Sequence, residues 1–160
     1  MKATRPLQTN YAGAIYGTIL SMAVIAASSK DPELGPVAVA GWAIATALVF
    51  FIAHVYSSIV AAGFARPVRA RGLIRIEAKK EWPMVQGAMI PAAVMLLAPL
   101  GILAEDRASY VAVWTGVAVL AAAGLVVGRK EGLGWGRSAI IGSINGAIGL
   151  VIVALKVFVH

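Results

Sequence analysis

Five long apolar runs divide the chain, and each is long enough to cross a lipid bilayer as a helix. A spanning helix needs about 20 mostly apolar residues. The runs lie at residues 10–29, 37–63, 84–104, 108–128 and 138–159. The pattern predicts an all-α integral membrane protein, a five-helix bundle that forms a single transmembrane domain over residues 1–160. The first run exceeds the roughly 7–15 apolar residues of a secretory signal, so we expect it to be a retained helix.

Polar segments separate the runs. The most basic of them, "ARPVRARGLIRIEAKKEWP" at residues 65–83, is predicted to be an ordinary loop. Its part "GLIRIEAKKEW" could instead form a short helix at the membrane interface, with Ile74 and Ile76 toward lipid. "EDR" at residues 105–107 is predicted to be a tight hairpin. Within the third run, Pro91 and Pro99 predict kinks whose freed carbonyls need other partners.

The basic residues are divided very unevenly between the two ends of these spans. Eleven of the 14 Lys and Arg residues fall on one side, and only Lys30, Arg107 and Lys156 fall on the other. Because Lys and Arg are retained in the cytoplasm, this distribution predicts a cytoplasmic N-terminus and a C-terminus outside. Apart from Lys156, the charged residues that make up the net charge of +7 lie outside the spans, so we expect no nucleic-acid partner.

Composition excludes several classes of chemistry. The chain has 160 residues, of which 60% are hydrophobic and none is cysteine. Its two histidines, His54 and His160, belong to opposite leaflets, which predicts no metal site. There is no G-x-S-x-G, H-E-x-x-H or P-loop sequence. We therefore expect neither an enzyme nor a bound cofactor.

Polar residues within the spans are the candidate functional residues. His54 lies in the apolar run "FFIAHVYSSI", slightly to the cytoplasmic side of the midpoint of its span. Other polar side chains fall at a similar depth or nearer the inner surface. The predicted intramembrane cluster comprises His54, Asn145, Tyr16, Thr18, Ser57, Ser58 and Gln86. Ionisable groups inside membranes usually face a cavity, and histidine titrates near physiological pH.

Two interpretations of His54 stay open. In the first, it is the titratable element of a proton or ion pathway. In the second, it hydrogen-bonds to Asn145 or Tyr16 and only locks two helices together. The sequence favours the second slightly, because a neutral histidine costs far less in a membrane than lysine or aspartate.

Small residues recur along two spans and predict close helix packing. They are Gly13, Gly17 and Ser21 in the first span, and Gly142, Gly146 and Gly149 in the last. Helices in lipid associate where small side chains let their backbones approach. Packing within one bundle is the simpler interpretation, and a seam between copies of the chain is the alternative.

Charged residues near the span ends have interfacial roles. Five cations of the basic stretch are predicted to contact anionic lipid headgroups: Arg69, Arg71, Arg75, Lys79 and Lys80. Glu81, in "EWP", is interpreted as an acid at the start of a helix. Lys156 is expected to extend its ammonium to the headgroups, or to pair with Glu105 or Asp106.

Three stretches carry a resemblance: "HVY" at 54–56, "EWP" at 81–83 and "INGAIGLVIVALK" at 144–156. They resemble those of uncharacterised small polytopic membrane proteins of high-GC bacteria, a group without an assigned activity. The resemblance implies a multi-pass protein of the bacterial inner membrane.

Three functions are compatible with these features. The first is a homo-oligomeric transport protein for ions, protons or a small solute, with His54 as its titratable element. The second is an accessory or assembly subunit of a larger membrane complex, without chemistry of its own. The third is a protein that binds or handles lipids through the basic stretch.

Overall fold

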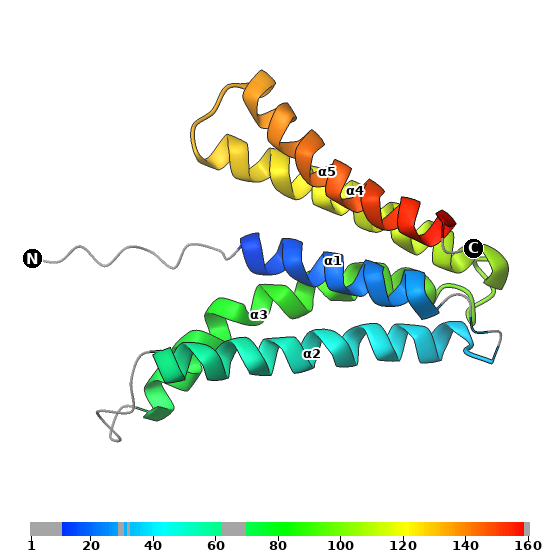
Figure 1. The fold of residues 1–160 in the computed structure, drawn as a ribbon, viewed down its shortest axis with the longest axis horizontal. Helices are drawn as coiled ribbons and strands as arrows, with labels where there is room; N and C mark the ends of the chain where they lie inside the picture. Colours follow the sequence, from blue (N-terminus) through cyan, green and yellow to red (C-terminus); the bar gives the residue numbers. More distant parts are fainter. Residues whose placement is uncertain (1–10, 29–30, 32, 62–69, 159–160) are drawn as a thin grey trace, which may run out of the picture.

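The computed structural model describes residues 11–28, 31, 33–61 and 70–158, and every regular element within these ranges is a helix. The five helices are α1 (Tyr11–Ser28), α2 (Pro36–Ala61), α3 (Ala70–Met95), α4 (Glu105–Lys130) and α5 (Trp135–Phe158). Successive helices run in opposite directions (Figure 1). The prediction of an all-α chain with five helices is confirmed.

Four of the helices, α1, α2, α4 and α5, are long and apolar enough to cross a membrane. Their ends agree with the predicted spans to within three residues. They expose large apolar side chains, among them Trp42, Ile52, Trp114 and Ile140. A soluble protein rarely exposes such a continuous apolar surface, whereas lipid covers it at no cost. The chain therefore has the features of a multi-pass membrane protein.

The prediction of a loop at residues 65–83 is wrong from residue 70 onward, because Ala70 is the first residue of α3. Residues 65–69 lie outside the described residues. Between Leu73 and Trp82 the chain has neither glycine nor proline and consists mostly of good helix formers. Lys80 and Glu77, three residues apart on the helix, also pair at 3.1 Å. The alternative of a helix in "GLIRIEAKKEW" thus agrees better with the structure.

The third predicted span also ends earlier than expected. The helix α3 stops at Met95, and residues 96–101 form turns instead of continuing to residue 104. The ring of Pro99 would clash with the carbonyl of Met95 in a continued helix. Gly101 then adopts a φ of +72°, which turns the chain back toward α4. The predicted hairpin at "EDR" is wrong, since Glu105 and Asp106 form the first turn of α4, where acids are favourable.

The helix α1 is the centre of the bundle and contacts all four other helices. The hairpin of α4 and α5 lies along one side of α1, and the pair of α2 and α3 lies along the other (Figure 1). The buried core includes Met22, Ile25, Ala43, Ala92 and Leu120. Within the described ranges, α2 and α5 do not pack against each other.

One end of the bundle is strongly basic. At this end lie the start of α1, the end of α2, the start of α3 and the connection from α4 to α5 (Figure 1). Its cations among the described side chains are Arg75, Lys79, Lys80, Arg129, Lys130 and Arg137. We refer to this end as the basic end. Glu105 and Asp106 lie at the opposite end, in the first turn of α4.

Candidate functional site

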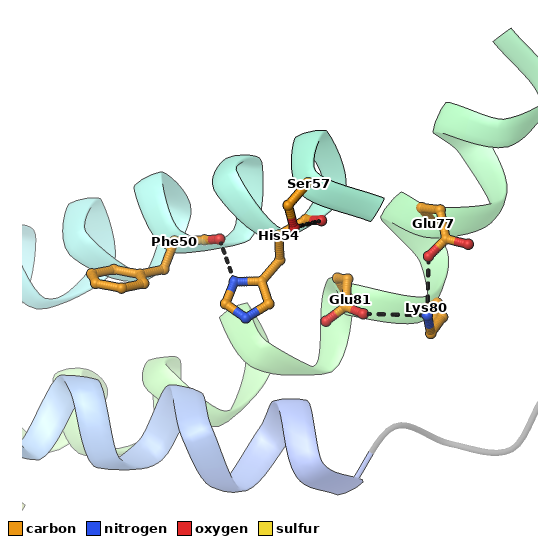
Figure 2. Close-up of polar contacts among 6 residues, drawn as sticks. All are labelled: Phe50, His54, Ser57, Glu77, Lys80 and Glu81. Atoms are coloured by element: carbon orange, nitrogen blue, oxygen red, sulfur yellow. Dashed lines mark hydrogen bonds and ion pairs between the residues drawn. The ribbon is translucent and has the colours of Figure 1, made fainter. Parts of the chain in front are cut away.

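His54 is half-buried on α2, two turns before that helix ends at the basic end. Its Nδ1 donates a hydrogen bond to the carbonyl oxygen of Phe50 at 2.9 Å, a bond that only a protonated Nδ1 can make. In the neutral ring Nε2 is consequently the nitrogen that can accept a proton. Figure 2 shows the ring directed away from α2 toward α3. Ser57 donates to the carbonyl of His54 at 3.0 Å and lies on the outside of the helix.

Tyr16 of α1 contacts the histidine ring. The centroids of the two rings lie 5.6 Å apart, with an angle of 53° between their planes. Tyr16 also meets the ring of Phe50 edge-on at 5.9 Å. Aromatic pairs in this distance range attract each other, so Tyr16 holds the imidazole between α1 and α2.

Glu81 of α3 is the third polar side chain at this place. It is buried, with a relative exposure of 7%. Its carboxylate lies 3.8 Å from the ammonium of Lys80, which is hydrogen-bonded to Glu77 at 3.1 Å (Figure 2). The interpretation of Glu81 as a helix-start acid is wrong, because α3 begins at Ala70, three turns earlier. Sequence reasoning did not place Glu81 beside His54, because the residues before it were assigned to a loop.

These three side chains line one partly open pocket of about 310 Å³. Its walls are Ala12, Gly13 and Tyr16 from α1, His54 from α2, and Glu81 and Met84 from α3. The volume has room for several water molecules at about 30 Å³ each. The pocket therefore places an imidazole, a carboxylate and a phenol ring around a space that can be hydrated. We call it the His54 pocket.

Asn145 is not part of this pocket, so its predicted convergence with His54 is wrong. Its side-chain amide donates to the carbonyl of Ile141 at 3.1 Å and packs against Gly124 of α4. It thus belongs to the α4–α5 hairpin, and α5 does not pack against α2 within the described ranges. The sequence gives the depth of a residue in its span but not the direction in which its side chain points.

Thr18 has a structural role between α1 and α3. Its hydroxyl lies 2.9 Å from the carbonyl oxygen of Ala14 and 3.2 Å from that of Gly87. Pro91 has no N–H, so the carbonyl of Gly87 lacks its usual helical donor. The Thr18 hydroxyl has one proton, which is shared between these two carbonyls, and it replaces the missing donor at Gly87. This agrees with the prediction that a carbonyl freed by proline needs another partner.

The remaining members of the predicted cluster lie elsewhere. Gln86 is exposed on α3, and Ser58 is half-buried near the end of α2. Neither lines the His54 pocket. Of the seven predicted residues, the structure brings only His54 and Tyr16 together there.

The small residues lie inside the bundle. All six are buried: Gly13, Gly17, Ser21, Gly142, Gly146 and Gly149. A methyl group added at Gly17 would overlap the carbonyl of Met84 in α3, and one at Gly142 would come within 2.8 Å of the carbonyl oxygen of Ala121 in α4. These faces are filled by helices of the same chain, in agreement with packing within one bundle.

Lys156 is buried near the end opposite the basic end, with 4% relative exposure. Its ammonium donates to the hydroxyl of Ser109 at 2.8 Å and lies 4.1 Å from the centroid of the Tyr110 ring. The prediction that Lys156 extends its ammonium to the headgroups is therefore wrong. Within the described residues Lys156 forms no ion pair with Glu105 or Asp106 either.

The predicted headgroup cations differ in their surroundings. Arg69 lies outside the described residues, and Arg71 belongs to α3 without a described side chain. Arg75, Lys79 and Lys80 are exposed on α3. The hydrogen bond from Lys80 to Glu77, together with the negative charges of Glu77 and Glu81, raises the pKa of the Lys80 ammonium above its ordinary value.

Among the residues that the structure describes, no group of three His, Asp or Glu side chains is arranged to hold a metal ion. Comparisons with models of protein families, with curated proteins and with solved structures gave no match to this chain. A proposal about its function therefore depends on the geometry of the chain itself.

Proposed function

We propose that this protein is a small membrane transport protein in which the His54 pocket binds a proton or a small cation on its way across the bilayer. The observation that carries the proposal is the convergence of His54, Glu81 and Tyr16 from three helices on one pocket. Buried carboxylates and imidazoles in membrane proteins typically serve proton or ion pathways. An isolated packing histidine would not need a buried carboxylate beside the same space.

The chemistry of proton binding follows from the hydrogen bonds of the ring. Because the carbonyl of Phe50 holds Nδ1–H, an arriving proton binds at Nε2. The resulting imidazolium would lie in the same pocket as the Glu81 carboxylate and beside the Tyr16 ring. Water in the pocket would connect Nε2 to the carboxylate. Lys80 also places a positive charge 3.8 Å from the Glu81 carboxylate.

We infer an orientation in which the basic end faces the cytoplasm, following the distribution of Lys and Arg. In this arrangement α3 also crosses the membrane, in addition to α1, α2, α4 and α5. The N-terminus is then cytoplasmic and the C-terminus lies outside. The longest stretch of α3 without a charged residue is Trp82–Met95, with a length of roughly 21 Å at about 1.5 Å per residue. The turns up to Gly101 would complete this crossing. The His54 pocket would then open toward the cytoplasm. The membrane itself would be, as the resemblance implies, a bacterial inner membrane.

The His54 pocket lies within one chain, so proton binding does not require a second copy. A homo-oligomer remains our expectation for the rest of the pathway, since one small bundle offers little room for a complete route. The alternative of an accessory subunit was suggested by the small-residue faces. These faces are covered inside the bundle and do not favour it.

Proton flux into proteoliposomes tests the proposal. The purified protein is reconstituted with a pH-sensitive dye inside, and a potassium diffusion potential drives proton entry. We expect His54→Ala to lower the flux about a hundredfold or more, in line with the usual contribution of a positioned proton-transfer group. Ser57→Ala, one turn away on the exposed side of α2, is the matched control and should leave the flux unchanged. Equal flux in wild type and a folded His54→Ala variant would contradict the proposal.

A further inference from the structure

A second pocket, on a different face of α3, has a different chemical character. This groove of about 350 Å³ lies between α2 and α3 near the basic end. It is lined by Phe51, Arg75, Ala78, Lys79 and Trp82. The rings of Phe51 and Trp82 meet edge-on, with centroids 5.8 Å apart and planes at 84°. The groove thus has a mostly apolar wall and two cations at its rim.

The two rim cations are not neutralised by the acids of their own helix. Arg75 and Lys79 are four residues apart, so they lie one above the other on one face of α3, and Trp82 continues this face one turn further. Glu77 and Glu81 lie on the opposite side, where both interact with Lys80. Within the described residues neither Arg75 nor Lys79 forms an ion pair with a carboxylate. Their positive charges are available to a ligand.

We propose that this groove binds one anionic glycerophospholipid. Its phosphate lies between the guanidinium of Arg75 and the ammonium of Lys79, and the upper part of an acyl chain lies against Phe51 and Trp82. Arginine suits phosphate because its planar fork of N–H groups matches two phosphate oxygens. Tryptophan is enriched where acyl chains meet headgroups, since its ring is apolar and its N–H is polar. The apolar wall argues for a lipid over a soluble phosphate compound, which would leave that wall exposed.

The site is separate from the His54 pocket, although α3 contributes to both. Glu81 and Met84 face the His54 pocket, whereas Arg75, Lys79 and Trp82 face the groove. Loss of lipid binding and loss of proton flux can therefore be told apart by variants on the two sides of one helix. A lipid bound at the groove would hold the charged half of α3 at the membrane surface.

Native mass spectrometry of the detergent-purified protein tests the proposal, with phosphatidylglycerol and phosphatidylcholine as probes of matched acyl chains. We expect one phosphatidylglycerol to bind at about tenfold lower concentration than phosphatidylcholine, because each nearby cation strengthens anionic-lipid binding several-fold. Phosphatidylglycerol with brominated chains should quench tryptophan fluorescence, and Trp82→Phe should remove that part of the quenching. Inorganic phosphate at millimolar concentration should not displace the lipid.

A pair of double variants separates the groove from the general charge of the basic end. The variant Arg75→Gln with Lys79→Gln should lose the preference for phosphatidylglycerol. The matched control, Lys80→Gln with Arg137→Gln, removes the same charge from the same end and should keep the preference.

Three results would overturn the assignment: equal affinity for both lipids, displacement by inorganic phosphate, or equal loss of the preference in both double variants. The first two use the wild-type protein alone, so they remain decisive even where a variant does not fold.

Discussion

The ring of Tyr16 on α1 lies 5.6 Å from the ring of His54 on α2, and both line the pocket that contains the buried Glu81 of α3. This contact joins the central helix of the bundle to the only intramembrane histidine of the described residues. The hydrogen bond from Nδ1 of His54 to the carbonyl of Phe50 leaves Nε2 as the available ring nitrogen.

The ring of Tyr16, more than its hydroxyl, should matter for proton binding. The face of an aromatic ring stabilises an adjacent cation by about 0.5–1 kcal/mol at a partly exposed site. We therefore expect Tyr16→Ala to lower the flux about two- to fivefold, whereas Tyr16→Phe should retain most of it. Flux in proteoliposomes at several pH values is the measurement. A loss in Tyr16→Phe as large as that in Tyr16→Ala would contradict this, because it would show that the hydroxyl, not the ring, has the main role.

Gly17 should be essential for the packing of α1 against α3. A Cβ at this position would overlap the backbone of Met84, so the two helices would have to separate. We expect Gly17→Ala to destabilise the protein by about 1–3 kcal/mol or more, as overpacking does. Gly41→Ala is the control: it lies on the exposed face of α2 with open space around it, and should be neutral or stabilise by about 0.5–1 kcal/mol. Thermal unfolding in detergent compares the two, and similar stabilities would contradict the close contact.

Two hydroxyls of α1 should respond in opposite ways to their removal. Thr18→Val leaves the carbonyl of Gly87 without a donor, because Pro91 cannot supply one. A buried unsatisfied group costs about 1–3 kcal/mol, so this variant should be destabilised by that amount. The Ser21 hydroxyl is buried and has no hydrogen-bond partner among the described residues. Ser21→Ala should therefore be neutral or slightly stabilising.

Unfolding measurements on both variants, under identical detergent conditions, test this pair. A destabilisation of Ser21→Ala as large as that of Thr18→Val would contradict the assignment. It would mean that Ser21 has a hydrogen-bond partner, such as bound water.

The ion pair of Lys80 should stabilise the protein slightly, and this contribution should be lost at alkaline pH. Its hydrogen bond to Glu77 raises the pKa of the ammonium in the folded state above the unfolded value of about 10.4. The contribution is therefore complete below about pH 10.4 and is lost as the pH rises through the higher folded pKa. Because the Lys80 side chain is exposed, the effect is small. Following the ¹⁵N shift of the Lys80 ammonium against pH should show a lower pKa in Glu77→Gln, and an unchanged titration would contradict the pairing.

The sequence was sufficient for the features that depend on depth and periodicity. The four apolar helices and the burial of the glycine ridges follow from local composition. The need for a donor at a proline-freed carbonyl was also predictable, although its identity, Thr18, was not. Which hydroxyl reaches the carbonyl of Gly87 depends on the angle at which α1 and α3 cross. This crossing angle cannot be predicted from the local sequence of either helix.

The candidate site was only half predictable for the same reason. His54 and Tyr16 were grouped correctly by depth, but Asn145 was grouped with them although its side chain points to Gly124. Glu81 was set aside because charges at 65–83 suggested a loop. Glutamate, lysine and arginine are good helix formers, so the charge density that marks a membrane boundary does not end a helix.

The central claim is that His54 and Glu81 act together at one proton-binding site, and a double-variant cycle on flux tests it most directly. Proteoliposomes with wild type, His54→Ala, Glu81→Gln and the double variant are compared under the same potassium diffusion potential. If the two residues form one site, the double variant should lose about as much flux as the more impaired single variant, since groups acting as a unit are non-additive. If the losses multiply, or if folded Glu81→Gln transports protons at the wild-type rate, the two residues act independently and the account is contradicted.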